Sequence, residues 1–207
     1  MTVSDPLAPN VAPRHGTATR AIEAAAQAFA NRGVAATSLD DLARTMGVTK
    51  QTILYHHKSK SGLLSAVLVD AANTLRHELD RSTEASAAGW PRVESAVRAA
   101  FGLAVRRPEL LGLLREVGRL GPPVSDDVIE LLQPMVDRAV ESLELGMEAG
   151  EFRRSDPRLV LVSSYAAVTG VVSDPELLRA VGLELDMRTA AKLRRTVLDF
   201  LEAALRP

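Results

Sequence analysis

Apolar side chains recur every three or four residues along most of the chain, which is the spacing of one face of an α-helix. The first such stretch begins near Arg20 and stops at Gly33, a residue that commonly ends helices. Ala, Leu, Arg and Glu are abundant and aromatic residues make up only 3% of the chain, a balance that favours helices over strands. We therefore expect an all-α protein. The apolar positions of the first stretch are Ile22, Ala25, Ala26, Phe29 and Ala30.

Two short helices are predicted next, separated by a turn at Gly47. Thr37 and Ser38 can cap the first of them, and Thr49 can cap the second, which runs to about His56. A small Ala43 lets the two helices approach each other, and the second helix is left with a polar outer face, as in a helix-turn-helix. The residues available for the buried side are Leu39, Leu42, Met46, Val48, Ile53 and Leu54.

Longer helices fill the rest of the chain. The first of these, from Ser59 to about Thr83, carries a continuous apolar stripe and is expected to link two regions. Further helices follow the break at Gly89, and the Asp-Pro pairs at 156–157 and 174–175 each combine a cap residue with proline at the first helical position. The last helix is predicted from about Met187 to Ala204. Residues 1–16, interrupted by three prolines, are expected to form a flexible tail.

Charge is distributed unevenly, although the whole chain has a formal net charge of only −1. Residues 1–60 contain seven Lys and Arg against four Asp and Glu, a net charge of +3, so the remainder carries −4. A basic amino-terminal unit on an acidic body attracts phosphates locally and keeps the rest of the protein away from DNA. This asymmetry supports a DNA-binding role for residues 17–60.

Several classes of protein are disfavoured. The chain has no cysteine, which excludes disulfides, thiolate metal sites and cysteine nucleophiles. No nucleophile, base and oxyanion-donor motif is visible, so we predict no catalytic residues and no enzyme. The adjacent His56 and His57 do not converge on one ion, so no metal or other cofactor is predicted. The apolar run at 159–172 is interrupted and shorter than the roughly 20 residues of a membrane span. With no signal segment evident, we expect a cytoplasmic protein without a membrane partner.

The stretch AIEAAAQAFANRGVAATSLDDLARTMGVTKQTILYHHKSKSGLL resembles the amino-terminal DNA-binding domain of the TetR family of bacterial one-component transcriptional regulators. The similar region, residues 17–64, is about a quarter of the chain. This sequence has His57 where the family commonly has Phe, and Gln51 where the family has a small residue. The resemblance implies a helix-turn-helix domain at 17–60 and an effector-binding and dimerisation domain at 61–207.

The resemblance also implies roles for individual residues, and their chemistry agrees. Hydroxyl, imidazole and ammonium groups are suitable donors to phosphate oxygens, whereas Lys, Gln and Thr side chains can distinguish base edges. Tyr55 could alternatively be a core residue beside Leu54. Phosphate contacts are predicted for Thr37, Ser38, Tyr55, His56 and Lys60, base contacts for Lys50, Gln51 and Thr52, and Thr49 completes the DNA-binding set.

In the family the last two helices pair with a second subunit, which implies a homodimer on a near-palindromic operator of double-stranded DNA. The helical body is expected to hold an unknown small-molecule effector. Arg115 could anchor an acidic effector, or pair with a carboxylate or lie in solvent. The candidate effector residues are Phe101, Leu113, Arg115, Met135 and Tyr165. The expected function is a ligand-responsive repressor, with an activator or an effector-independent DNA-binding protein as alternatives.

Overall fold

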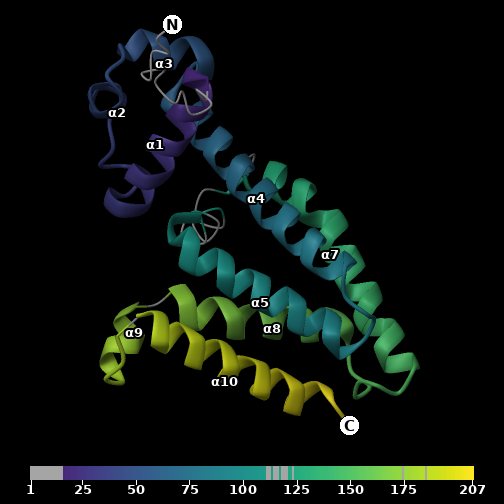
Figure 1. The fold of residues 1–207 in the computed structure, drawn as a ribbon. Helices are drawn as coiled ribbons and strands as arrows, with labels where there is room; N and C mark the ends of the chain where they lie inside the picture. The colour runs from purple at the N-terminus through teal and green to yellow at the C-terminus, as the bar shows by residue number, and fades with distance from the viewer. Residues whose placement is uncertain are drawn as a thin grey trace, which may run out of the picture.

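The computed structural model of the chain describes residues 16–110, 113, 117, 121–122, 124–173, 175–184 and 186–207. These residues form α-helices and contain no strand, which confirms the all-α prediction (Figure 1). The predicted tail and Arg115 lie outside the described residues. The helices are α1 (Thr17–Arg32), α2 (Leu39–Met46), α3 (Lys50–His57), α4 (Lys60–Glu84), α5 (Trp90–Arg106), α7 (Val124–Glu148), α8 (Pro157–Ser173), α9 (Pro175–Ala180) and α10 (Met187–Leu205).

Local capping chemistry explains where the short helices begin and end. Ser38 accepts a hydrogen bond from the backbone N–H of Asp41 at the start of α2, and Thr49 accepts one from Thr52 at the start of α3. Between them Gly47 adopts the left-handed conformation, with φ 67° and ψ 34°. A residue without a Cβ takes that conformation at little cost, so the turn predicted at this position is confirmed.

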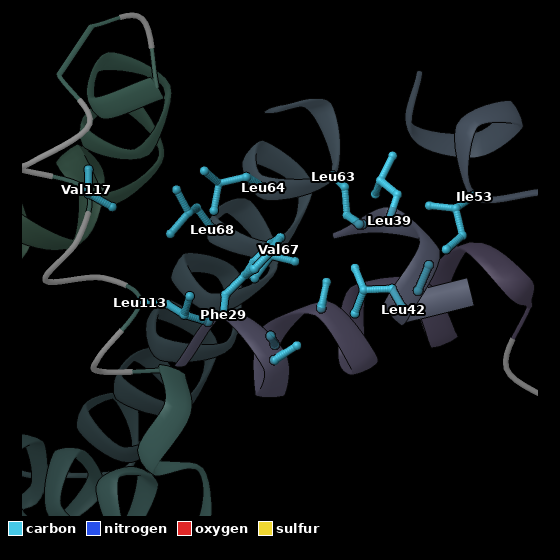
Figure 2. Packing of buried hydrophobic residues seen from close by; sticks show 14 of the residues in the cluster. Phe29, Leu39, Leu42, Ile53, Leu63, Leu64, Val67, Leu68, Leu113 and Val117 are labelled. Carbon is cyan, nitrogen blue, oxygen red and sulfur yellow. The ribbon is translucent and has the colours of Figure 1, made fainter. Parts of the chain in front are cut away.

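The core of the amino-terminal unit includes the first half of α4 (Figure 2). Phe29 of α1, Leu42 of α2 and Ile53 of α3 are almost fully buried, and they belong to one apolar cluster with the α4 side chains. The same cluster continues to Val128 of α7 in the body. Because α4 takes part in both units, no gap in the core separates the DNA-binding region from the rest. The α4 members of the cluster are Leu63, Leu64, Val67, Leu68 and Ala72.

The body is built around α5. On one side α5 contacts α4, which in turn lies beside α7, and on the other side α5 contacts α8 and α10 (Figure 1). Phe101 of α5, Val168 of α8 and Leu201 of α10 are buried together where the last three helices meet. None of the described helices has the length and apolar composition required to cross a membrane.

Candidate DNA-binding surface

Helix α3 presents a polar face to solvent because only Ile53 and the partly buried Leu54 hold it to the core. Ile53 is only 1% exposed, whereas the side chains around the opposite face remain accessible. Tyr55 is 75% exposed, so the alternative of a core tyrosine is wrong. Its ring packs edge-on against His56, with centroids 5.1 Å apart. The helix therefore places Lys50, Gln51, Thr52, Tyr55 and His56 on an accessible or partly accessible surface.

An ion pair joins α3 to α2 on this surface. The Lys50 Nζ atom lies 2.8 Å from the Oδ2 atom of Asp40, and both side chains are well exposed. A neighbouring carboxylate, Asp41, accepts a hydrogen bond from the Ser38 hydroxyl and pairs with Arg44 at 3.0 Å. The Ser38 hydrogen bond, reinforced by the Arg44 guanidinium, lowers the pKa of Asp41 below its ordinary value.

The structure corrects the prediction that Thr37 contacts phosphate. Thr37 is 1% exposed, and its hydroxyl oxygen lies 2.9 Å from the Gly33 carbonyl and 3.3 Å from that of Ala28. The hydroxyl therefore ties the α1–α2 connection to the end of α1. Ser38 remains exposed, but its one hydroxyl hydrogen is donated to Asp41 while it caps α2, so a phosphate contact would replace that hydrogen bond.

The turn between α3 and α4 gathers three basic or potentially basic side chains. Lys60 donates a hydrogen bond to the Ala35 carbonyl at 3.3 Å while staying partly accessible, and Lys58 donates to the Tyr55 carbonyl at 3.1 Å. His57 is half-buried, with Nε2 3.3 Å from the carbonyl oxygen of Ala18 in α1. That contact shows how a histidine fits where the family usually has an aromatic residue. Among the described residues there is no cluster of side chains that could hold a metal ion.

The predicted effector residues that the structure describes do not lie together. Phe101 is buried between α5, α8 and α10, whereas Leu113 packs into the cluster of α1 and α4. Met135 is half-buried on α7, and Tyr165 is 56% exposed on α8. The inward orientation predicted for Tyr165 is therefore wrong, because the apolar character of α8 extends to its solvent-facing side.

The sequence model described as "Bacterial regulatory proteins, tetR family" matches residues 21–67, which run from α1 into the first half of α4. Residues 21–67 are thus similar to the TetR family of regulators. Members of this family are transcriptional regulators rather than enzymes. The matched region contains the whole helix-turn-helix and the part of α4 that completes its core.

Individual proteins extend the comparison. The HTH-type transcriptional regulator TtgR of Pseudomonas putida is 41% identical over 68 residues, 33% of this chain and 32% of that protein. The chain thus matches about a third of the length of this relative. A putative transcriptional regulator from Saccharomonospora viridis in complex with choline has a TM-score of 0.77 at 19% identity, covering 91% of this chain and 96% of that one. AibR in complex with isovaleryl coenzyme A and operator DNA has a TM-score of 0.74 at 20% identity, covering 92% and 98%. These likenesses show that the whole chain, including the body, shares the fold of these proteins.

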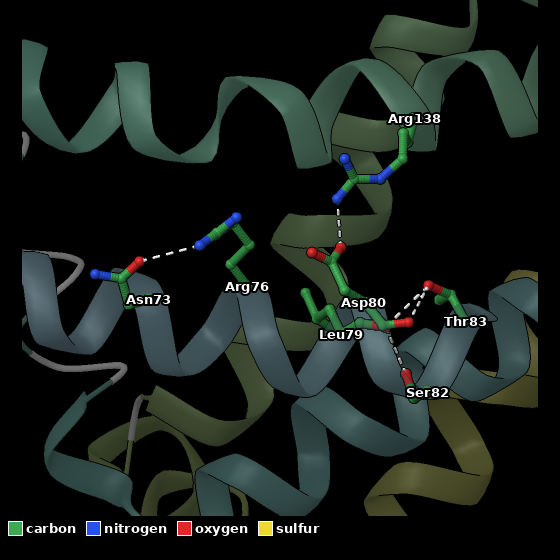
Figure 3. A network of polar contacts seen from close by, with 7 residues as sticks. All are labelled: Asn73, Arg76, Leu79, Asp80, Ser82, Thr83 and Arg138. Atoms are coloured by element: carbon green, nitrogen blue, oxygen red, sulfur yellow. Dashed lines mark hydrogen bonds and ion pairs between the residues drawn. The ribbon is translucent and has the colours of Figure 1, made fainter. Parts of the chain in front are cut away.

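One polar residue of the body was missed by the sequence analysis. Arg76 extends from α4 toward α7 and donates a hydrogen bond to Asn73 at 3.3 Å, but its Nε atom is buried without a hydrogen-bond partner (Figure 3). Nearby, Asp80 of α4 pairs with Arg138 of α7. Arg76 follows the fully buried Ala72 by four residues, which places it on the same helix face. The four-residue spacing from Ala72 could have predicted, from the sequence alone, that Arg76 lies on the inward-facing side of α4.

Proposed function

We propose that this chain is a transcriptional regulator that binds a near-palindromic operator as a homodimer and leaves it when a small molecule binds the body. The observation that carries the proposal is the exposed polar face of α3, within the part of the chain that matches the TetR family. A short helix with accessible polar side chains on a basic unit is suited to the major groove.

The DNA contacts divide by chemistry. Lys50 and Gln51 carry donors suited to guanine and adenine edges, and the Thr52 methyl group can meet a thymine methyl. Thr49 fixes the start of α3 and lies beside Thr52, with 2.9 Å between their hydroxyl oxygens. Phosphate contacts, which set the register on DNA without reading its sequence, fall to exposed or partly exposed donors. We assign them to Ser38, Tyr55, His56 and Lys60.

A homodimer is supported by apolar surface on the last helices of the body. Leu159 and Val162 of α8 are 65% and 64% exposed, and Phe200 of α10 is 61% exposed. Helices α8 and α10 pack against each other, so both can contribute to one interface with a second copy. Two recognition helices about 34–36 Å apart can then enter successive major grooves.

An effector with an acidic group is supported by Arg76. A guanidinium has five N–H donors, and a buried donor without a partner costs about 1–3 kcal/mol. A ligand carboxylate or phosphate between α4 and α7 would satisfy that group, so we assign Arg76 as its anchor. Two structural neighbours carry small ligands, choline in one and isovaleryl coenzyme A in the other. Of the sequence candidates, Met135 on α7 remains a proposed wall residue of this site.

Binding to DNA from upstream of its own gene tests the proposal. Fluorescence anisotropy of the labelled fragment and of a scrambled one is measured at two salt concentrations. Contacts to phosphates alone would bind both fragments equally and would weaken as the salt concentration rises. We expect a preference of at least ~10³ for the native fragment. The double variant Lys50→Ala, Tyr55→Ala should lose most of this preference, and Arg154→Ala, an exposed arginine outside the DNA-binding unit, should keep it.

The other outcomes identify the alternatives. Equal, salt-sensitive binding to both fragments would favour an effector-independent DNA-binding protein, and no binding at low salt would refute the proposal. Transcription in vitro from the same fragment distinguishes a repressor, which lowers transcript yield, from an activator, which raises it.

A further inference from the structure

A groove with a volume of about 520 Å³ runs between α5 and α10. Its lining includes the indole of Trp90 and the buried Leu198, so part of the surface is apolar. The volume lies within the roughly 300–1,000 Å³ range of small-molecule sites, which combine apolar surface with a few charged groups. The groove is therefore large enough for a metabolite.

The charges that line the groove are strongly unbalanced. On α10 four lining cations, Arg188, Lys192, Arg194 and Arg195, have no salt bridge or side-chain hydrogen bond in the described part of the chain. Two of the three lining acids are already paired, since Arg98 holds Glu94 at 2.6 Å and Arg206 holds Glu202 at 2.9 Å. Among the lining acids only Asp199 is left without an ion pair, and outside the lining Asp186 interacts with Arg188. Clefts lined by one sign of charge concentrate ligands of the opposite sign.

The position of the groove separates it from the DNA-binding surface. Helix α10 lies at the opposite end of the molecule from α1, α2 and α3 (Figure 1). Its cations therefore cannot contact the DNA segment that α3 reads. The residues from 61 onward carry a net charge of −4, so this basic groove is a local exception on an acidic body.

We propose that this groove binds a small phosphorylated metabolite with at least two negative charges, its phosphates held by the α10 cations and its apolar part placed against Trp90 and Leu198. Arginine forks match phosphate oxygens in pairs, and an ammonium such as that of Lys192 adds a point charge. This site is separate from the proposed effector site at Arg76, because Arg76 lies between α4 and α7 and does not line the groove.

The binding test uses the full chain and an intrinsic probe. Trp90 is the only tryptophan of the sequence, so its fluorescence reports directly on the groove. We would titrate the protein with inorganic pyrophosphate and with ADP, using sodium chloride at matched ionic strength as the reference, and verify binding by calorimetry. A saturable response to either phosphate, absent with chloride, is expected. Tighter binding of ADP would mean that the nucleoside contacts the apolar floor, whereas equal affinities would assign recognition to the phosphates.

Substitutions in the groove test whether phosphate binds there. The double substitution Lys192→Gln, Arg195→Gln should weaken phosphate binding by at least about tenfold, since hydrogen bonds to charged groups contribute about 1.5–3 kcal/mol each. Arg154→Gln, which removes an exposed arginine outside the groove, should leave binding unchanged.

Two results would overturn the proposal. The first is no saturable response to either phosphate by the folded wild-type protein. The second is unchanged phosphate affinity in the double variant, which would place phosphate binding elsewhere. Dissociation of that variant to monomers in analytical ultracentrifugation would then make the cations a subunit contact. Neither measurement contains DNA, so failure here leaves the proposed regulatory function unaffected.

Discussion

The ion pair between Lys50 and Asp40 places a carboxylate on the surface that is proposed to face DNA. Exposed pairs of this kind contribute only about 0–1 kcal/mol to folding, so orientation of the Lys50 ammonium is the more important effect. The carboxylate also repels phosphates. Where a DNA sequence offers Lys50 a base acceptor, the hydrogen bond to that base compensates for the repulsion between Asp40 and the phosphates. On other sequences nothing compensates, so Asp40 weakens binding to them.

We predict that Asp40→Asn weakens the discrimination between the two DNA fragments while raising the affinity for both. Affinity for scrambled DNA should rise roughly three- to fivefold, and affinity for the upstream fragment should rise less, because the Lys50 ammonium loses its fixed direction. Anisotropy titrations of both fragments give the ratio. Asp70→Asn, an exposed acid farther along α4, is the matched control. An equal rise for both fragments would show that Asp40 acts only through its charge.

The lowered pKa of Asp41 predicts a pH-dependent contribution to stability. A carboxyl whose folded pKa lies below its ordinary value of 3.8 stabilises the protein above that pH. This stability is lost as the pH falls through the lower folded value. The difference in unfolding free energy between wild type and Asp41→Asn should therefore be largest at neutral pH and shrink in acid. Urea unfolding followed by circular dichroism measures it, and a difference independent of pH would contradict the assignment.

At the scale of elements, Gly62 sets how closely α4 approaches the end of α3. A Cβ at this position would lie 2.2 Å from the carbonyl oxygen of His57, which is backbone and cannot simply rotate away. Gly62→Ala should therefore cost about 1–3 kcal/mol, as overpacking does, and weaken DNA binding by displacing α3.

Gly170 provides the matched control for this substitution. It also lies within a helix, α8, but a Cβ there would meet nothing within 4 Å. Gly170→Ala should raise the unfolding free energy by roughly 0.5–1 kcal/mol, because alanine loses less backbone freedom in a helix. Urea titrations compare the two variants. Equal effects would mean that the Gly62 contact relaxes without cost.

Arg76 joins α4 to the space beside α7 without completing its hydrogen bonds, so its removal should not destabilise the fold. We predict that Arg76→Met keeps or slightly raises the melting temperature, since an incompletely paired interior charge is replaced by an apolar side chain. Thermal shifts with octanoate and shorter straight-chain carboxylates should appear in the wild type and disappear in this variant. Arg81→Met, on the same helix but 68% exposed, is the control. Identical carboxylate shifts in Arg76→Met would exclude Arg76 as the anchor.

The helices were largely predictable from the sequence because their ends depend on neighbouring residues. Ser38, Thr49 and Gly47 act within a few positions of themselves, and each does what its local pattern indicates. Thr37 differs because its hydroxyl meets the carbonyl of Ala28, nine positions away, and only the packing of α1 against α2 decides that it is buried.

The same distinction separates the α3 surface from the effector site. The polar residues of α3 share one short helix, so their grouping follows from helical spacing. The proposed effector residues come from different helices, and no local pattern determines which of them meet. Phe101 and Leu113 are both apolar positions on predicted helices, yet they pack into different clusters.

At the scale of the whole molecule, the exposed apolar side chains of α8 predict how subunits assemble. Val162→Glu should convert the proposed homodimer to a monomer and reduce affinity for the upstream fragment by at least about tenfold, because one recognition helix then binds alone. Ile129→Glu, on α7, is the matched control, since Ile129 is 56% exposed outside the proposed interface. Sedimentation at micromolar concentration measures both. A monomeric wild type, or a dimeric Val162→Glu, would refute the assigned interface.

Helix α4 packs in the core of both units, so a rotation of this helix in the body also moves the DNA-binding unit. Its 25 residues extend for about 37 Å, at 1.5 Å per residue. One end is fixed in the core beneath α3, and the other carries Asp80, which pairs with α7. A tilt of about 5° at the far end therefore displaces the near end by roughly 3 Å, close to the 3.4 Å rise of one DNA base pair. In the proposed regulator, motion too small to disrupt the packing of the body would thus be amplified into a change of register on the operator.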